Sequence, residues 1–237
     1  MKKTDLSVIA ITILILLPFF IFEQAYHGYE AFNAAHPFIM AFLKFGILAT
    51  FGEMLGLRIK TGSYNYKGFG IVPRAIVWGC LGMWIAAAMG IFSKGVPAFL
   101  EARFDFFAGI TAAMNSSFSG LKLCGAFFIS VMMNTSFAPV FMTLHKITDT
   151  HILNNGGKAS CLLKPLPVRK IIASLNWDVQ WNFVFKKSIP LFWIPAHTVT
   201  FILPPNMQVL FAALCGVALG LILSIAGKGK SQSPKTV

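Results

Sequence analysis

Charged residues are scarce in this sequence. Asp, Glu, Lys and Arg make up 12% of the 237 residues, and only 8 of them are acidic, whereas a soluble domain carries about 25% charged residues. Apolar residues make up 56% of the chain, and the segments 8–22 and 207–226 contain no charged residue. Such a chain cannot cover its apolar surface in water, which excludes a soluble enzyme and a disordered protein. The composition predicts a protein of the lipid bilayer.

Motifs that carry chemistry are also missing. The four cysteines are scattered, with no CxxC pair and no zinc-site spacing. The sequence has no Ser/His/Asp order, Gly-rich phosphate loop, HExxH motif or carboxylate pair where water could reach it. His145, Asp149 and His151 come closest to a metal site, but their spacing fits no recognised site, and we expect a solvated loop there. The sequence predicts no enzyme, no cofactor and no metal.

Six segments are apolar and long enough to cross a membrane, which takes about 20 residues of helix. The sequence thus predicts one all-α integral membrane domain over residues 1–237, a polytopic bundle of about six transmembrane helices. Pro190, Pro195 and His197 weaken the fifth span, so four spans plus two half-buried helices is the alternative. The predicted spans are Leu6–Phe22, Pro37–Leu57, Ala75–Phe92, Leu121–Leu144, Ser188–Leu203 and Asn206–Ala226.

Basic residues fall almost wholly on one side of this topology. Only Lys94, Arg103 and Lys122 lie in segments of the opposite side. Because basic loops tend to stay in the cytoplasm, we expect both termini there, and topology accounts for the net charge of +12 without a nucleic acid partner. The first apolar segment is too long for a signal peptide, and the basic start lacks an Arg- and Ser-rich transit segment. We therefore expect a bacterial plasma membrane, with an organelle membrane as the alternative.

Residues 146–187 are predicted to form a basic loop and an amphipathic helix on the inner side. Polar residues recur at i, i+4 spacing along the helix, with Trp177 and Trp181 beside them. The helix would lie in the membrane interface as a structural anchor or as a docking surface for lipid headgroups. Residues 228–237 are predicted to form a flexible basic tail. The polar stripe consists of Lys170, Ser174, Asp178, Asn182 and Lys186.

Small residues recur every four positions along several predicted spans. Lipid gives helices no hydrophobic reason to associate, so such stripes mark the faces where backbones approach closely. We expect these stripes to face the interior of the bundle. They are Gly52 and Gly56; Gly82, Ala86 and Gly90; Ala126, Ser130, Asn134 and Ala138; and Ala212, Gly216, Gly220 and Ser224.

Three ionisable residues lie inside the predicted spans, where each costs about 2.5–3.5 kcal/mol to insert. Glu53 lies on the small-residue face of its span and is expected to point into the bundle, where a simple ion pair with Arg58 or Arg74 is the structural alternative. Lys44 lies on the opposite face of the same helix, where it either lines a polar path or extends to the interface.

The third ionisable residue, His197, follows a proline, and the polar residue Asn134 precedes one. Carbonyl groups freed by such a proline give a polar side chain a partner inside the membrane. A histidine satisfied in the core is the structural alternative to a gate. The candidate pore or gating residues are Lys44, Glu53, Asn134 and His197.

A distinctive pattern of Trp, Pro and Phe occupies residues 193–224. It resembles the C-terminal signature of the twenty-two-kilodalton peroxisomal membrane protein family, the Mpv-seventeen and Sym-one group. His197 and Thr200 stand where the family has Gln and Asn, and Gln208 or its neighbour stands where the family has Arg. The resemblance implies a small, channel-like multispan bundle. The positions that carry it are Trp193, Pro195, Phe201, Pro205, Gln208 and Ser224.

Two functions remain open at this point. The first is a channel or transporter for small solutes or ions, with membrane lipids and small metabolites or ions as partners. The second is a non-transporting membrane scaffold or assembly protein that uses the basic inner loop to hold a partner. A homo-oligomer is a further option, and no nucleic acid partner is expected.

Overall fold

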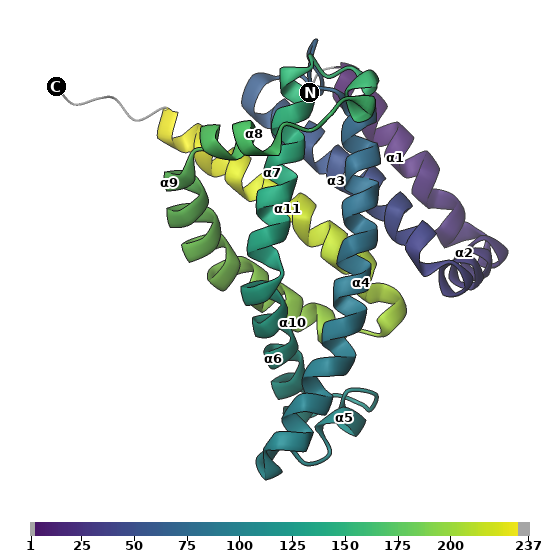
Figure 1. The fold of residues 1–237 in the computed structure, drawn as a ribbon. Coiled ribbons are helices and arrows are strands. Elements are labelled where there is room, and N and C mark those ends of the chain that lie inside the picture. Colours follow the sequence, from purple (N-terminus) through teal and green to yellow (C-terminus); the bar gives the residue numbers. More distant parts are fainter. Residues whose placement is uncertain (1–2, 232–237) are drawn as a thin grey trace.

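A computed structural model describes residues 3–231, and every regular element in that range is a helix (Figure 1). This confirms the predicted all-α fold. The long elements are α1 (Lys3–Ile21), α2 (Glu23–Ala35), α3 (Pro37–Thr61), α4 (Ile71–Arg103), α6 (Gly120–Ser136), α7 (Ala138–Asn154), η3 (Gln180–Trp193), α10 (Ile194–Ile202) and α11 (Pro205–Ser231). The short elements are η1 (Asp105–Phe107), α5 (Ile110–Ala113), η2 (Ala159–Leu163), α8 (Val168–Ser174) and α9 (Trp177–Val179).

Within residues 3–231, four helices are long and apolar enough to cross a membrane, namely α1, α3, α4 and α11. The helices α6 and α7 meet at a bend of 47°. Taken together as one bent span, they add a fifth. The bend falls where Pro139, at the start of α7, lacks the N–H that would continue the hydrogen bonding of α6. The predicted span Leu121–Leu144 is therefore two helices that meet at an angle.

The predicted fifth span, Ser188–Leu203, falls on η3 and α10. Neither is among the span-length apolar helices of the described chain. The 14 residues of η3 form a π-helix that contains Pro190, and α10 starts with Pro195 in its first turn. Each proline removes a backbone donor, and in η3, around Pro190, the chain winds more widely than an α-helix does. The two elements together still lead the chain from α8 to the start of α11 (Figure 1).

The predicted amphipathic helix over residues 170–186 is wrong as a single element. It is broken at Leu175, which is extended, and Asn176 then begins α9 with its side chain accepting a hydrogen bond from the Val179 N–H. Trp177 Nε1 donates back to the Ile172 carbonyl at 2.9 Å across the break. Asn at such a position favours a new helix start over continuation, which interrupts the stripe. Of the predicted basic tail, residues 228–231 continue α11, and 232–237 lie outside the described residues.

Close backbone contacts hold α3 between α4 and α11. A β-carbon added at Gly46 would lie 2.9 Å from the Ala75 carbonyl oxygen on α4. On the other side, a β-carbon at Gly52 would lie 3.1 Å from the Cα of Val217 on α11. Glycine at these positions lets the helices approach at backbone distance, as expected for association in lipid. The prediction that Gly52 faces the bundle is confirmed.

The small-residue stripe on α4 runs from Gly82 through Ala86 to Gly90, and it is packed at its start but exposed at its end. A β-carbon at Gly82 would lie 2.5 Å from the Cβ of Phe45, whereas one at Gly90 would have no atom within 4 Å. Gly90 is also exposed, so the expectation that it faces the bundle is wrong. The helix stays close to α3 only over its first half.

This difference gives a matched pair of substitutions. We expect Gly82→Ala to lower the free energy of unfolding by about 1–3 kcal/mol, because the new methyl group overlaps Phe45 and the helices must separate. Gly90→Ala on the same helix should be neutral or stabilising by about 0.5–1 kcal/mol, since alanine restricts the unfolded chain. Thermal unfolding in detergent measures both. Equal melting temperatures for the two variants would contradict the close contact of α3 with α4.

Candidate functional site

A cavity of about 450 Å³ lies between the helices, lined by residues of α3, α4, α6, α7, η3, α10 and α11. Its walls are mostly apolar and aromatic, with Phe45, Ile85, Phe141, Leu219 and Leu223 among the lining residues. This size and lining are typical of a small-molecule site. Three of the four candidate residues, Glu53, Asn134 and His197, line this one cavity.

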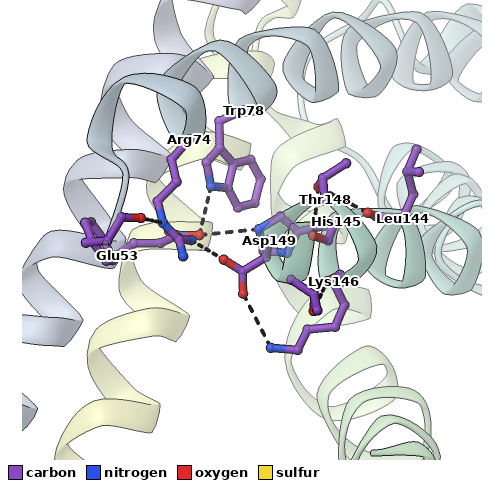
Figure 2. A network of polar contacts seen from close by, with 10 residues as sticks. Glu53, Arg74, Trp78, Leu144, His145, Lys146, Thr148 and Asp149 are labelled. Carbon is purple, nitrogen blue, oxygen red and sulfur yellow. Dashed lines mark hydrogen bonds and ion pairs between the residues drawn. The ribbon is translucent and has the colours of Figure 1, made fainter. Parts of the chain in front are cut away.

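Charged residues from three helices meet at one end of the cavity, as Figure 2 shows. Arg74 Nη1 on α4 lies 2.5 Å from Glu53 Oε2 on α3 and also contacts Asp149 Oδ1 on α7. Trp78 Nε1 donates to Glu53 Oε1 at 2.9 Å, and His145 Nε2 lies 3.3 Å from the same oxygen. The Arg74 side chain, 7% exposed, is the most buried member. We call these five residues the charged cluster.

Local sequence explains how the charged cluster is assembled. Arg74 and Trp78 are four residues apart in the first turns of α4, and His145 and Asp149 are four residues apart in α7, so each pair projects from one helix face. Arg74 is fixed further, because its Nε donates to the Phe69 carbonyl at 2.8 Å and its guanidinium lies over the Phe69 ring. The two pairs meet at Glu53, where the Trp78 and His145 rings lie 4.3 Å apart between centroids.

The charged cluster balances its own charge. Arg74 bridges two carboxylates, and Lys146 Nζ approaches Asp149 Oδ2 at 3.4 Å from the exposed side. The two acids of the charged cluster are thus matched by Arg74 inside it and by Lys146 at its exposed edge. Buried carboxylates need such partners, because an unpaired charge in a low-dielectric interior is costly. The structural alternative for Glu53, an ion pair with Arg74, is therefore present in the structure.

Asn134 and His197 form a second polar group toward the other end of the cavity. Asn134 Nδ2 donates to the Ser130 carbonyl at 2.8 Å and lies 3.0 Å from His197 Nδ1. Asn134 lies on α6 just before the bend, and the cavity wall then continues along α7 from Ala138 to Asp149, a rise of about 17 Å, so the two polar ends are separated along the cavity. The Trp193 ring packs against the His197 ring, with 5.1 Å between centroids. We call Asn134, Trp193 and His197 the polar pole.

The polar pole has a defined proton arrangement. The Ser130 carbonyl can only accept, which identifies the Asn134 atom beside it as the NH₂ nitrogen. That nitrogen can only donate, so His197 Nδ1 accepts and the ring proton sits on Nε2. His197 is 8% exposed and Asn134 is 1% exposed. The structural alternative from the sequence, a core histidine with a polar partner, is met at Nδ1, which faces the Asn134 amide.

Lys44 lies apart from the other candidates. It is 7% exposed and does not line the cavity; its Nζ donates to Asn33 Oδ1 at 2.6 Å and lies 5.2 Å from the centre of the Tyr29 ring. Both partners are on α2. Lys44 therefore joins α2 to α3 and takes neither of the two positions expected from the sequence, a polar path through the bundle or the lipid interface.

The family-signature positions have mixed surroundings. Trp193 and Ser224 line the cavity, and Phe201 is a core residue at 1% exposed. The others shape the backbone: Pro195 lies in the first turn of α10, Pro205 begins α11, and Gln208 Nε2 donates to the Leu203 carbonyl at 3.0 Å between these helices.

Sequence reasoning missed most of the charged cluster. His145 and Asp149 lie in helix α7, and the Asp149 side chain is only 13% exposed, so the expected solvated loop is wrong. The neighbouring His151 is also buried, and its Nε2 is hydrogen-bonded to the Cys161 carbonyl at 3.0 Å. Burial raises the pKa of the Cys161 thiol. No group of three His, Cys, Asp or Glu residues in the described range could hold a metal ion. The sequence did contain one signal for the cluster. Arg74 and Trp78, and likewise His145 and Asp149, are four residues apart, a spacing that puts both members of a pair on one face of a helix.

Comparison of the chain with protein-family models, curated proteins and solved structures gave no match. The resemblance of residues 193–224 to a family therefore stays a prediction.

Proposed function

We propose that this chain is a multi-pass integral membrane protein that binds a small solute in its central cavity and carries it across the membrane. The observation that supports this is the cavity of about 450 Å³, which is lined in part by the span-length helices α3, α4 and α11 and carries polar groups at both ends. Polar groups buried in a bundle of this kind are typical of a solute pathway. The signature resemblance, which implies a channel-like bundle, agrees with the proposal.

The proposed topology has six passes with both termini in the cytoplasm of a bacterium. The start of α1, the end of α3, the start of α4 and α8 lie at one end of the bundle (Figure 1). There Arg58 Nη2 on α3 pairs with Asp5 Oδ2 on α1 at 2.7 Å. The basic segments 158–170 and 58–67 belong to this end, as the positive-inside rule requires of a cytoplasmic face. In this topology η3 and α10 complete the fifth pass.

The cavity favours a neutral solute over an ion. Its middle section is walled by apolar and aromatic side chains, which give a moving ion no replacement for its hydration shell. The charged cluster is occupied by its internal ion pairs, and an ion would have to break these to bind. A neutral solute encounters neither obstacle.

Solute flux from proteoliposomes tests the proposal. We expect wild-type protein to accelerate entry of at least one of glycerol, propylene glycol and urea above empty vesicles, with no added potassium conductance in planar bilayers. Glu53→Gln retains the shape of the charged cluster but removes one charge, and it should change the flux more than Lys44→Gln, which lies outside the cavity. Flux equal to that of empty vesicles for every probe would reject transport and leave the scaffold interpretation.

A further inference from the structure

The polar pole carries hydrogen-bonding groups of both kinds that the protein leaves unused. Asn134 Oδ1, an acceptor, and Trp193 Nε1–H, a donor, are buried without a hydrogen-bond partner among the described residues. His197 Nε2, the second donor, has no hydrogen bond within residues 3–231, although it does not belong to the fully buried polar atoms. All three residues line the cavity. Buried groups of this kind are rare in folded proteins because each loses its hydration, so their presence needs an explanation.

We propose that the polar pole binds the hydroxyl group of a neutral, largely apolar alcohol, whose hydrocarbon body occupies the middle of the cavity. This inference names the ligand class and rests on the proposed function, in which the cavity binds a solute. A hydroxyl group donates one hydrogen bond and accepts up to two. It can donate to Asn134 Oδ1 and accept from Trp193 Nε1 or His197 Nε2. Asn134 and Trp193 both contact the His197 ring, so we infer that one hydroxyl group can serve the acceptor and a donor together.

Charged head groups fit these partners poorly. A carboxylate could accept from Trp193 and His197, but it has no proton for Asn134 Oδ1 and would place two negative oxygens beside that acceptor. An ammonium group could donate to Asn134 but would face two N–H donors. Either charge would also be buried without a counter-ion, because the charged cluster lies at the far end of the cavity. The pole therefore selects a neutral group that both donates and accepts.

The body of the ligand follows from the walls. Between the polar pole and the charged cluster, the lining includes Phe45, Ile85, Phe137 and Phe141. Gly216 on α11 adds free space, because a β-carbon there would meet no atom within 4 Å. Water could occupy the polar pole, but water gains nothing from these hydrocarbon walls, whereas an alkyl chain does. The arrangement fits an alcohol with an alkyl or aromatic body.

Photolabelling of the full-length protein in proteoliposomes tests the inference. The probe is a fatty alcohol that carries a diazirine on its chain, and labelled peptides are identified by mass spectrometry. We expect label on α11 around Ala213 and Gly216, and octanol should compete for it, whereas octane, octanoate and octylamine should not at equal membrane concentration. Label on the exposed α1 is the internal control for labelling from lipid and should respond to none of them.

Two substitutions separate the head group from the cavity. Asn134→Leu removes the unpaired acceptor with little change in size, and Trp193→Phe removes only the unused N–H while retaining a ring against His197. We expect each to lower octanol-competed labelling of α11 roughly tenfold, the size of one lost hydrogen bond to a buried partner. Retained folding of Trp193→Phe keeps the test valid if Asn134→Leu unfolds.

Each outcome has a distinct meaning. Equal competition by octanol, octane and octanoate, or unchanged labelling in Trp193→Phe, would overturn the alcohol site and leave a non-selective cavity. Absence of competed label from α11 would overturn both the alcohol site and solute binding in the cavity. Selective labelling without measurable flux would support the alcohol site while rejecting transport.

Discussion

Arg74→Met is expected to lower the free energy of unfolding by about 3–5 kcal/mol. Methionine fills a similar volume but removes the one cation that contacts both Glu53 and Asp149. Two carboxylates from different helices would then lie side by side in a largely buried site, and breaking a buried ion pair on one side costs about this much. Thermal and denaturant unfolding in detergent measure the loss.

Lys146→Met is the matched control for that prediction. Lys146 belongs to the same network, 3.4 Å from Asp149, but its side chain is 51% exposed. Exposed ion pairs contribute about 0–1 kcal/mol, so this variant should unfold almost like the wild type. Adding Glu53→Gln to Arg74→Met should recover part of the loss by removing one unpaired charge. A small effect of Arg74→Met, equal to that of Lys146→Met, would mean that the charged cluster does not hold α3, α4 and α7 together.

Gly157→Ala should lower the free energy of unfolding by about 3 kcal/mol. Gly157 has φ of +66°, and a β-carbon there would lie 2.5 Å from the Gly68 carbonyl oxygen and 2.6 Å from the Gly70 nitrogen. Backbone atoms cannot move aside as a side chain can, so the clash adds to the cost of about 1 kcal/mol for a left-handed residue other than glycine. The loop that begins α4, and with it Arg74, would have to shift.

The adjacent residue provides the control. Gly156 has φ of +64°, but a β-carbon there would meet no atom within 4 Å. Gly156→Ala should therefore cost only the conformational term of about 1 kcal/mol. The difference between the two variants, about 2 kcal/mol in unfolding experiments, isolates the contact between the two loops. Equal losses would show that this contact contributes nothing to stability.

The helical class and the positions of the long helices could be predicted, because both follow from the period and length of apolar runs. The bend at Pro139 and the break at Leu175 could not be predicted as firmly, because proline and asparagine permit a continuous helix or a new one, and packing decides between them. The π-helix η3 is a similar case. Its wide winding reflects Pro190 together with tertiary contacts that a local pattern does not contain.

The candidate site was predictable one residue at a time but not as an arrangement. Glu53, Asn134 and His197 stood out because polar groups in apolar helices are rare, and the structure brings them to one cavity. Lys44 met the same criterion, yet its partners are on the neighbouring α2, which only tertiary structure reveals. His145 and Asp149 looked like a solvated pair because their surroundings in sequence are polar. Their partners, Glu53 for His145 and Arg74 for Asp149, lie far away along the chain.

The most direct test of the account fills the cavity and leaves everything else in place. Gly216→Leu puts a side chain into the free space on α11, and Gly90→Leu adds the same side chain to an exposed position on α4 where a β-carbon also meets nothing within 4 Å. Both proteins, reconstituted beside the wild type, should fold and orient alike. The account predicts that solute flux falls to the level of empty vesicles in Gly216→Leu and is unchanged in Gly90→Leu. Wild-type flux through Gly216→Leu would contradict a pathway through the central cavity.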